Sequence, residues 1–134
     1  MSAESVSLIK GIYEAFGRGD VPAAVAAMSP DIVWNEAENF PYADGNPYRG
    51  PDAILSGVFA RIFSEWDGFS VVPEQFLDAG ETVVMIGRYV GTHKGTGTAM
   101  NPQVVHVWTV AGGKAAGFQQ FVDTLGVAQA MGTA

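Results

Sequence analysis

Hydrophobic residues recur at spacings of three and four in the first half of the chain, which is the period of an amphipathic α-helix. The first such stretch runs from Glu4 to Arg18, and Gly17 and Gly19 end it. Its apolar residues fall on one face: Val6, Ile9, Ile12, Tyr13 and Phe16. The pattern predicts a helix that buries this face.

Two further helices are predicted before the middle of the chain. Asp20 is a suitable N-cap for a short helix over Val21 to Met28, which Pro30 stops. Pro51 occupies the position that proline favours at the start of a third helix. The apolar stripe of that helix is wide: Ile54, Leu55, Val58, Phe59, Ile62, Phe63 and Trp66. It is broad enough to cover a sheet.

The second half of the chain changes to strand-like patterns. The runs are 69–77, 82–92, 99–110 and 115–123, separated by the turn sequences DAGE, KGTGT and AGGK. These gaps are too short for crossover helices, so the strands are expected to form an antiparallel meander. The sequence therefore predicts an α+β domain with helices on one face of a curved antiparallel sheet.

The stretch DIVWNEAEN, residues 31–39, predicts one more strand, and it contains two glutamates. Side chains alternate along a strand, so Trp34, Glu36 and Glu38 share one side. Either this side faces solvent, or a carboxylate points beside an indole into an apolar interior, where burial raises its pKa. Residues 39–50 follow as an irregular loop rich in proline and glycine, suited to a lid.

Both faces of the predicted sheet are apolar in the runs VVMIGRYV and VVHVWTV. Helices can cover one face, and the other face then needs a partner. For a domain of this size a second copy is the expected cover, so the sequence predicts a homodimer through the outer sheet face.

Composition and charge narrow the function. The 134 residues fit a single domain over 1–134. The net charge is −7 and the seven basic residues are scattered, so nucleic acid and anionic membranes are not expected partners. The sequence contains no cysteine, no signal-like start and no long apolar run, which favours a cytoplasmic protein. His93 and His106 lack metal-binding spacing, so no metal site is expected.

Two ionisable residues lie in or at the end of the late strands. His106 shares a face with Val104 and Trp108, and it is either a core residue or a functional group. Asp123 shares a face with Gln119 and ends its strand. It is either a functional acid or the N-cap of a terminal helix over TLGVAQAM.

The element order and several short motifs resemble a known family. The motifs are YEAFGRGD, DIVW, a proline-rich loop ending in YRGPDAI, the turn GGK and the ending FVDT. Over essentially its whole length the chain resembles the SnoaL-like polyketide cyclases, within the nuclear transport factor 2-like, ketosteroid-isomerase-like superfamily. The resemblance implies a cone-shaped sheet around a deep apolar pocket, and a dimer.

The resemblance also implies catalytic residues. Glu36 falls where ketosteroid isomerases have their general base, and His106 falls near their hydrogen-bond-donating acid. Asp123 matches the acid that SnoaL-like cyclases use for proton transfer. The helix-one tyrosine of the isomerases falls on Ile12, with Tyr13 one residue along and about 100° around the helix.

These residues predict a cofactor-free acid-base enzyme of cyclase or isomerase type that acts on a small hydrophobic carbonyl compound. Two alternatives stay open: a non-catalytic dimeric domain that binds a small hydrophobic ligand, and a scaffold with a filled pocket. The expected pocket wall is mainly aromatic: Trp34, Tyr48, Phe59, Phe63, Met85, Tyr89, Met100 and Trp108.

Overall fold

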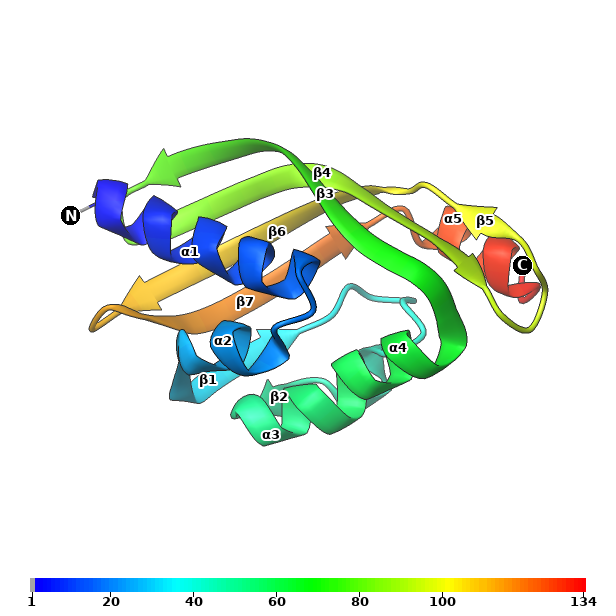
Figure 1. Cartoon of the computed structure of the whole chain (residues 1–134), viewed down its shortest axis with the longest axis horizontal. Coiled ribbons are helices and arrows are strands. Elements are labelled where there is room, and N and C mark those ends of the chain that lie inside the picture. The colour runs from blue at the N-terminus through cyan, green and yellow to red at the C-terminus, as the bar shows by residue number, and fades with distance from the viewer. Residues whose placement is uncertain (1) are drawn as a thin grey trace.

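The computed structural model describes residues 2–134 and confirms the α+β fold (Figure 1). Helix α1 spans Ser2–Gly17, and α2 spans Val21–Ala26. Asp20 caps α2 as predicted, because its carboxylate accepts a hydrogen bond from the backbone N–H of Ala23 at 3.1 Å. Helix α2 ends earlier than expected, since Met28 already belongs to the following strand.

The third predicted helix is one continuous helical segment with an irregular centre. It consists of α3 (Pro51–Ile54), the π-helical η2 (Leu55–Phe59) and α4 (Ala60–Glu65). Its buried residues follow the predicted stripe, whereas Phe63 lies at the edge of the stripe and is 45% exposed. Trp66, expected in this helix, is the first residue of the next strand.

Within the described residues, seven strands form one curved, open sheet in the order β2-β1-β7-β6-β4-β3, with β5 paired to β4. The meander β3-β4-β6-β7 is antiparallel, as predicted. The first strand, β1, lies beside the last strand, β7, and pairs with it in parallel, so the sheet is mixed. The strands are β1 (Met28–Asn35), β2 (Tyr48–Arg49), β3 (Trp66–Ala79), β4 (Thr82–His93), β5 (Ala99–Met100), β6 (Gln103–Ala111) and β7 (Lys114–Val122).

Helices α1, α2 and the 51–65 segment lie on one face of the sheet, and the core fills the space between (Figure 1). The short helix α5 (Thr124–Met131) packs near β5 at one end of the sheet. The loop after β1 contains the 3₁₀ turn η1 (Ala43–Gly45). None of the helices within residues 2–134 is long and apolar enough to cross a bilayer.

The sheet face opposite the helices carries apolar side chains that the single chain leaves partly accessible. Ile86 pairs with Val105 across β4 and β6, and Val84 pairs with Val107. All four are half-buried, and Phe121, opposite Val105 on β7, is 54% exposed. The homodimer through this face stays a prediction.

Candidate active site

A cavity lies between the helices and the inner face of the sheet. The free space at its centre is about 50 Å³, room for a few water molecules. Most of its wall is apolar: Ile12, Phe16, Trp34, Val58, Phe59, Ile62, Phe69, Val71, Trp108 and Phe118. The polar or ionisable members of the wall are Tyr13, Glu36, Tyr89, His106 and Gln120.

Glu36 points into this cavity beside Trp34, which settles the two interpretations of the DIVWNEAEN strand. Glu36 is 3% exposed, whereas the side chain of Glu38 is exposed. Glu36 Oε2 and Trp34 Nε1 are both buried without a hydrogen-bond partner. Burial raises the pKa of the Glu36 carboxyl to about 8, although the nearby Trp34 indole and the charge of Arg61 oppose the shift.

His106 sits at the centre of a buried hydrogen-bonded chain. Its Nδ1 lies 2.6 Å from the Tyr13 hydroxyl, and its Nε2 lies 2.6 Å from the Tyr89 hydroxyl. Trp108 Nε1 donates to the Tyr13 oxygen at 2.8 Å, and Gln120 Nε2 donates to the Tyr89 oxygen at 2.8 Å. The predicted pocket histidine is therefore enclosed by two tyrosines.

The hydrogen bonds among Tyr13, His106 and Tyr89 leave one tyrosine hydroxyl hydrogen unused. Burial lowers the pKa of His106 to about 3, so the imidazole is neutral and has one N–H and one lone pair. One tyrosine must donate to it and the other must accept from it. The accepting tyrosine also receives a hydrogen bond from Trp108 or Gln120. In either tautomer of His106, the O–H of the accepting tyrosine is therefore not used in these hydrogen bonds. Both tyrosines line the cavity, so either one can present this O–H to it.

Both tyrosines stay neutral donors at physiological pH. Burial raises the pKa of Tyr13 and of Tyr89 above the ordinary value of 10. A neutral phenol that already accepts two hydrogen bonds is well prepared to donate to an oxygen that gains negative charge. The cavity therefore combines a carboxyl group in an apolar setting with a preorganised hydroxyl donor.

Asp123, which the resemblance grouped with Glu36 and His106 as a catalytic residue, does not line this cavity. Its side chain is exposed and caps α5 by accepting a hydrogen bond from Gly126 N–H at 3.1 Å. The reason is the alternation of β7: Phe118 and Gln120 point inward, whereas Gln119 and Phe121 point to the other face. Asp123 has the parity of the outward residues, and the N-cap alternative is the one the structure shows.

Half of the expected pocket wall lines the cavity. Trp34, Phe59, Tyr89 and Trp108 do so, and four residues do not: Tyr48, Phe63, Met85 and Met100. Tyr48 is buried under the loop, where its hydroxyl donates to the Tyr42 carbonyl at 2.6 Å. Phe63 stacks on Phe16 from the solvent side. Met85 and Met100 are buried core residues that do not line the cavity.

Two polar cavity residues, Tyr13 and Gln120, were not predicted as site residues. Tyr13 belongs to the apolar stripe of the first helix, so its inward direction was readable although its role was not. Gln120 has the same parity as Phe118, and a glutamine with the parity of an aromatic core residue was the available signal. Pairing of Gln120 with His106 across β6 and β7 places the two side chains together.

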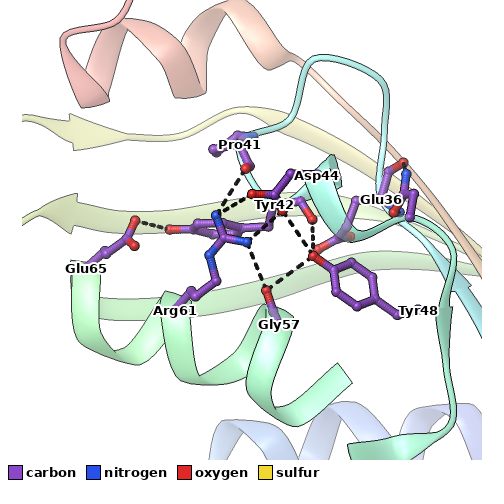
Figure 2. Close-up of polar contacts among 9 residues, drawn as sticks. Glu36, Pro41, Tyr42, Asp44, Tyr48, Gly57, Arg61 and Glu65 are labelled. Carbon is purple, nitrogen blue, oxygen red and sulfur yellow. Dashed lines mark hydrogen bonds and ion pairs between the residues drawn. The ribbon is translucent and has the colours of Figure 1, made fainter. Parts of the chain in front are cut away.

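Arg61 connects the loop between β1 and β2, which the sequence suggested as a lid, to the 51–65 helical segment. Figure 2 shows the guanidinium against the Asp44 carboxylate, with N–O distances of 2.7 and 3.1 Å. It also lies over the Tyr42 ring, 4.5 Å from the centroid. The Tyr42 hydroxyl in turn donates to Glu65 at 2.7 Å (Figure 2). The loop is thus fixed to the 51–65 helical segment.

No group of three or more histidine, aspartate or glutamate side chains in the part of the chain that the structure describes is placed to hold a metal ion. The polar cavity groups Tyr13, Tyr89 and His106 are joined by hydrogen bonds.

Fold and site together define the class of nuclear transport factor 2-like proteins, in which a curved sheet and helices enclose a cavity. The family model of the SnoaL-like domain matches residues 9–118, and the chain belongs to this family. None of the curated proteins matches the sequence at a significant level.

Several solved structures are similar over nearly the whole chain. An NTF2-like protein from Burkholderia thailandensis E264 is 42% identical with a TM-score of 0.91, over 95% of this chain and 96% of that one. An NTF2-like protein from Burkholderia pseudomallei K96243 is 26% identical, with a TM-score of 0.86 and the same coverages. TerC, co-crystallised with polyporic acid, is 25% identical with a TM-score of 0.86, over 96% of this chain and 98% of that one.

Proposed function

We propose that the protein is a cofactor-free acid-base enzyme of cyclase or isomerase type that acts on a small hydrophobic molecule bearing a carbonyl group. The observation that carries this proposal is the Glu36 carboxyl, which is buried with an unpartnered oxygen in an apolar cavity. A buried carboxyl oxygen without a hydrogen-bond partner costs stability, and such a cost is typical of a functional group.

Glu36 is the general base in this proposal. Its carboxylate removes a proton from the carbon next to the carbonyl; the C–H electron pair forms a C=C bond and the C=O π pair moves to the oxygen, which gives an enolate. In an isomerisation the protonated Glu36 returns this proton to another carbon of the conjugated system. In a cyclisation the enolate carbon attacks a second carbonyl of the same molecule, and Glu36 gives its proton to the new alkoxide. A base with a pKa of about 8 is suited to this step near neutral pH.

The enolate oxygen is stabilised by the tyrosine hydroxyl that His106 leaves free. His106 touches the substrate only through Tyr13 or Tyr89, because both its nitrogens are occupied. This differs from direct donation by the histidine, and it assigns the donor role to a tyrosine. Removal of one such donor costs about 10²- to 10³-fold in rate in other enzymes.

A substrate larger than a few water molecules requires part of the wall to move. We place its entry at Phe16, which lines the cavity and stacks on the exposed Phe63 with ring centroids 5.6 Å apart.

The test is exchange of the protons next to a carbonyl. A panel of small cyclic and aromatic ketones is incubated with the protein in D₂O at pD 8, and loss of the α-proton signal is followed by ¹H NMR. The protein is expected to accelerate exchange for the ketones that fit, and Glu36→Gln is expected to abolish the acceleration. The exposed neighbour Glu38 supplies the control variant, Glu38→Gln, which keeps it. If Glu36→Gln catalyses α-proton exchange at the same rate as the unmodified protein, the proposal is wrong.

A binding function without turnover is the second candidate. It is favoured by the mainly apolar wall and by the ligand reported in the related TerC structure. It predicts that a ketone or quinone raises the melting temperature while mass spectrometry recovers the compound intact, with no more deuterium than in protein-free buffer. Deuterium above that level rules this candidate out.

A further inference from the structure

Glu36 is buried although it lies one residue beyond the end of β1. The backbone pairing of β1 with β2 covers Val33 and Trp34, opposite Arg49 and Tyr48, and stops there. A residue beyond the end of a strand pairing normally has its backbone N–H and C=O hydrogen-bonded to water. The backbone of Glu36 is instead bonded by a side chain.

That side chain is Asn46. Its Oδ1 accepts a hydrogen bond from the Glu36 N–H at 2.9 Å, and its Nδ2 donates to the Glu36 carbonyl at 2.8 Å. The carboxamide therefore makes the two bonds that a further residue of β2 would make in a sheet. It extends the edge of the sheet by one residue, to the residue that carries the cavity carboxyl.

A second carboxamide holds the chain from the other side. The parallel pairing of β1 with β7 ends at Asn35 and Gln119. Gln120 Oε1 then accepts a hydrogen bond from the Ala37 N–H at 3.0 Å, and Gln120 Nε2 donates to the Tyr89 hydroxyl. The backbone that carries Glu36 is thus fixed between two amides, one of which also contacts the tyrosine–histidine chain.

We propose that Asn46 is a positioning residue for Glu36, because its carboxamide keeps the Glu36 backbone in an extended conformation that directs the carboxyl into the cavity. This inference rests on the proposed function only for its catalytic meaning; the positioning itself is a property of the free protein. Asn46, in the loop before β2, does not line the cavity. Its side chain lies on the same side as Gln119 and Phe121, which point away from the cavity.

The experiment is a ¹³C NMR titration of the Glu36 carboxyl in the full chain. Asn46→Ala removes both bonds, and Asn46→Ser serves if the alanine variant does not fold. The ionisable groups around Glu36 are Tyr13, Tyr89 and His106 in the cavity and Arg61 beyond the loop, and none hydrogen bonds to Asn46. A change in the titration therefore reports the position of Glu36.

The Glu36 pKa is expected to fall from about 8 by at least one unit in the Asn46 variants, because a released carboxyl reaches water. Asn101→Ala, which removes an exposed amide from another loop, leaves the titration unchanged. An Asn46 variant that is folded, even if less stable, and titrates as the unmodified protein overturns the positioning role. That result leaves the ketone-exchange test of Glu36→Gln untouched, so the two proposals fail separately.

Discussion

The carboxyl of Glu36 and the imidazole of His106 respond to pH in opposite ways. The folded pKa of Glu36 is about 8 against an ordinary 4.5, so its contribution to stability is full below pH 4.5 and is lost as the pH rises to 8. The folded pKa of His106 is about 3 against 6.5, so its contribution is full above pH 6.5 and is lost as the pH falls to 3. Between pH 4.5 and 6.5 the two slopes cancel.

Above pH 6.5 the slope of Glu36 remains alone. The free energy of unfolding is expected to fall by about 2 kcal/mol between pH 6.5 and 8, at about 1.4 kcal/mol per pH unit. Glu36→Gln removes this loss, whereas Glu38→Gln keeps it. The free energy of unfolding of the unmodified protein and of the two variants is measured by urea unfolding at pH 5, 6.5 and 8. A flat curve for the unmodified protein from pH 6.5 to 8 contradicts the buried, protonated carboxyl.

Asp123 gives a prediction with two separable readouts. Asp123→Asn is expected to keep ketone exchange, because the residue lies outside the cavity and its replacement still accepts a hydrogen bond at the N-cap. Asp123→Ala is expected to keep exchange as well, but to lose about 1 kcal/mol of stability. Exchange is followed by ¹H NMR and stability by urea unfolding. Loss of exchange in a folded asparagine variant returns Asp123 to the mechanism.

Strand alternation predicted the directions of the site residues where a strand is regular. It placed His106 with Trp108, and Glu36 with Trp34, and both pairs point inward. Applied to β7, the same rule gives Asp123 the outward parity of Phe121, and only the family resemblance placed it in the cavity. The partners of His106 could not be predicted, because Tyr13 comes from helix α1 and Tyr89 from strand β4, and the spacing of the two depends on the whole sheet.

At the scale of elements, the 51–65 helical segment depends on a glycine. A Cβ at Gly57 would lie 2.2 Å from Tyr48 Cε1, so the Tyr48 ring packs directly on the helix backbone. Gly57→Ala is expected to cost about 1–3 kcal/mol by overpacking. Gly11→Ala is the matched control: nothing lies within 4 Å of that site in α1. It is expected to gain about 0.5–1 kcal/mol.

Thermal or urea unfolding of the two alanine variants checks this pair. Equal gains in stability for both would show that Tyr48 can move away from the helix at little cost. The tyrosine would then not anchor the loop before β2.

Element types were predictable from the sequence, and their ends less so. The period of apolar residues gave three helices and the meander, but the start of β1 at Met28 and of β3 at Trp66 was missed. Met28 and Trp66 are apolar, and each would be buried both at the end of a helix and at the start of a strand. Periodicity therefore does not distinguish helix from strand at these two positions. The parallel pairing of β1 with β7 joins segments about 80 residues apart, and no local pattern encodes it.

At the scale of the molecule, the outer sheet face predicts a homodimer. Val105 lies between Ile86 and Phe121 on neighbouring strands, and Phe121 is more than half exposed. Val105→Arg is expected to shift the protein from dimer to monomer, because a charge at the centre of an apolar interface is costly to bury. Sedimentation equilibrium measures the mass, with Ser64→Arg, on an exposed helix position, as control. A monomeric unmodified protein contradicts the prediction.

The position of β1 between β2 and β7 also sets an order of events during synthesis. The residues that carry Glu36 emerge from the ribosome well before their neighbour in the sheet, residues 114–122, because the two paired segments lie about 80 residues apart. Until then Trp34 has no Phe118 to stack on, and the apolar strand stays uncovered. Pairing over such a separation slows folding. The site is therefore completed late, and a nascent chain carries an exposed aromatic strand that chaperones can bind.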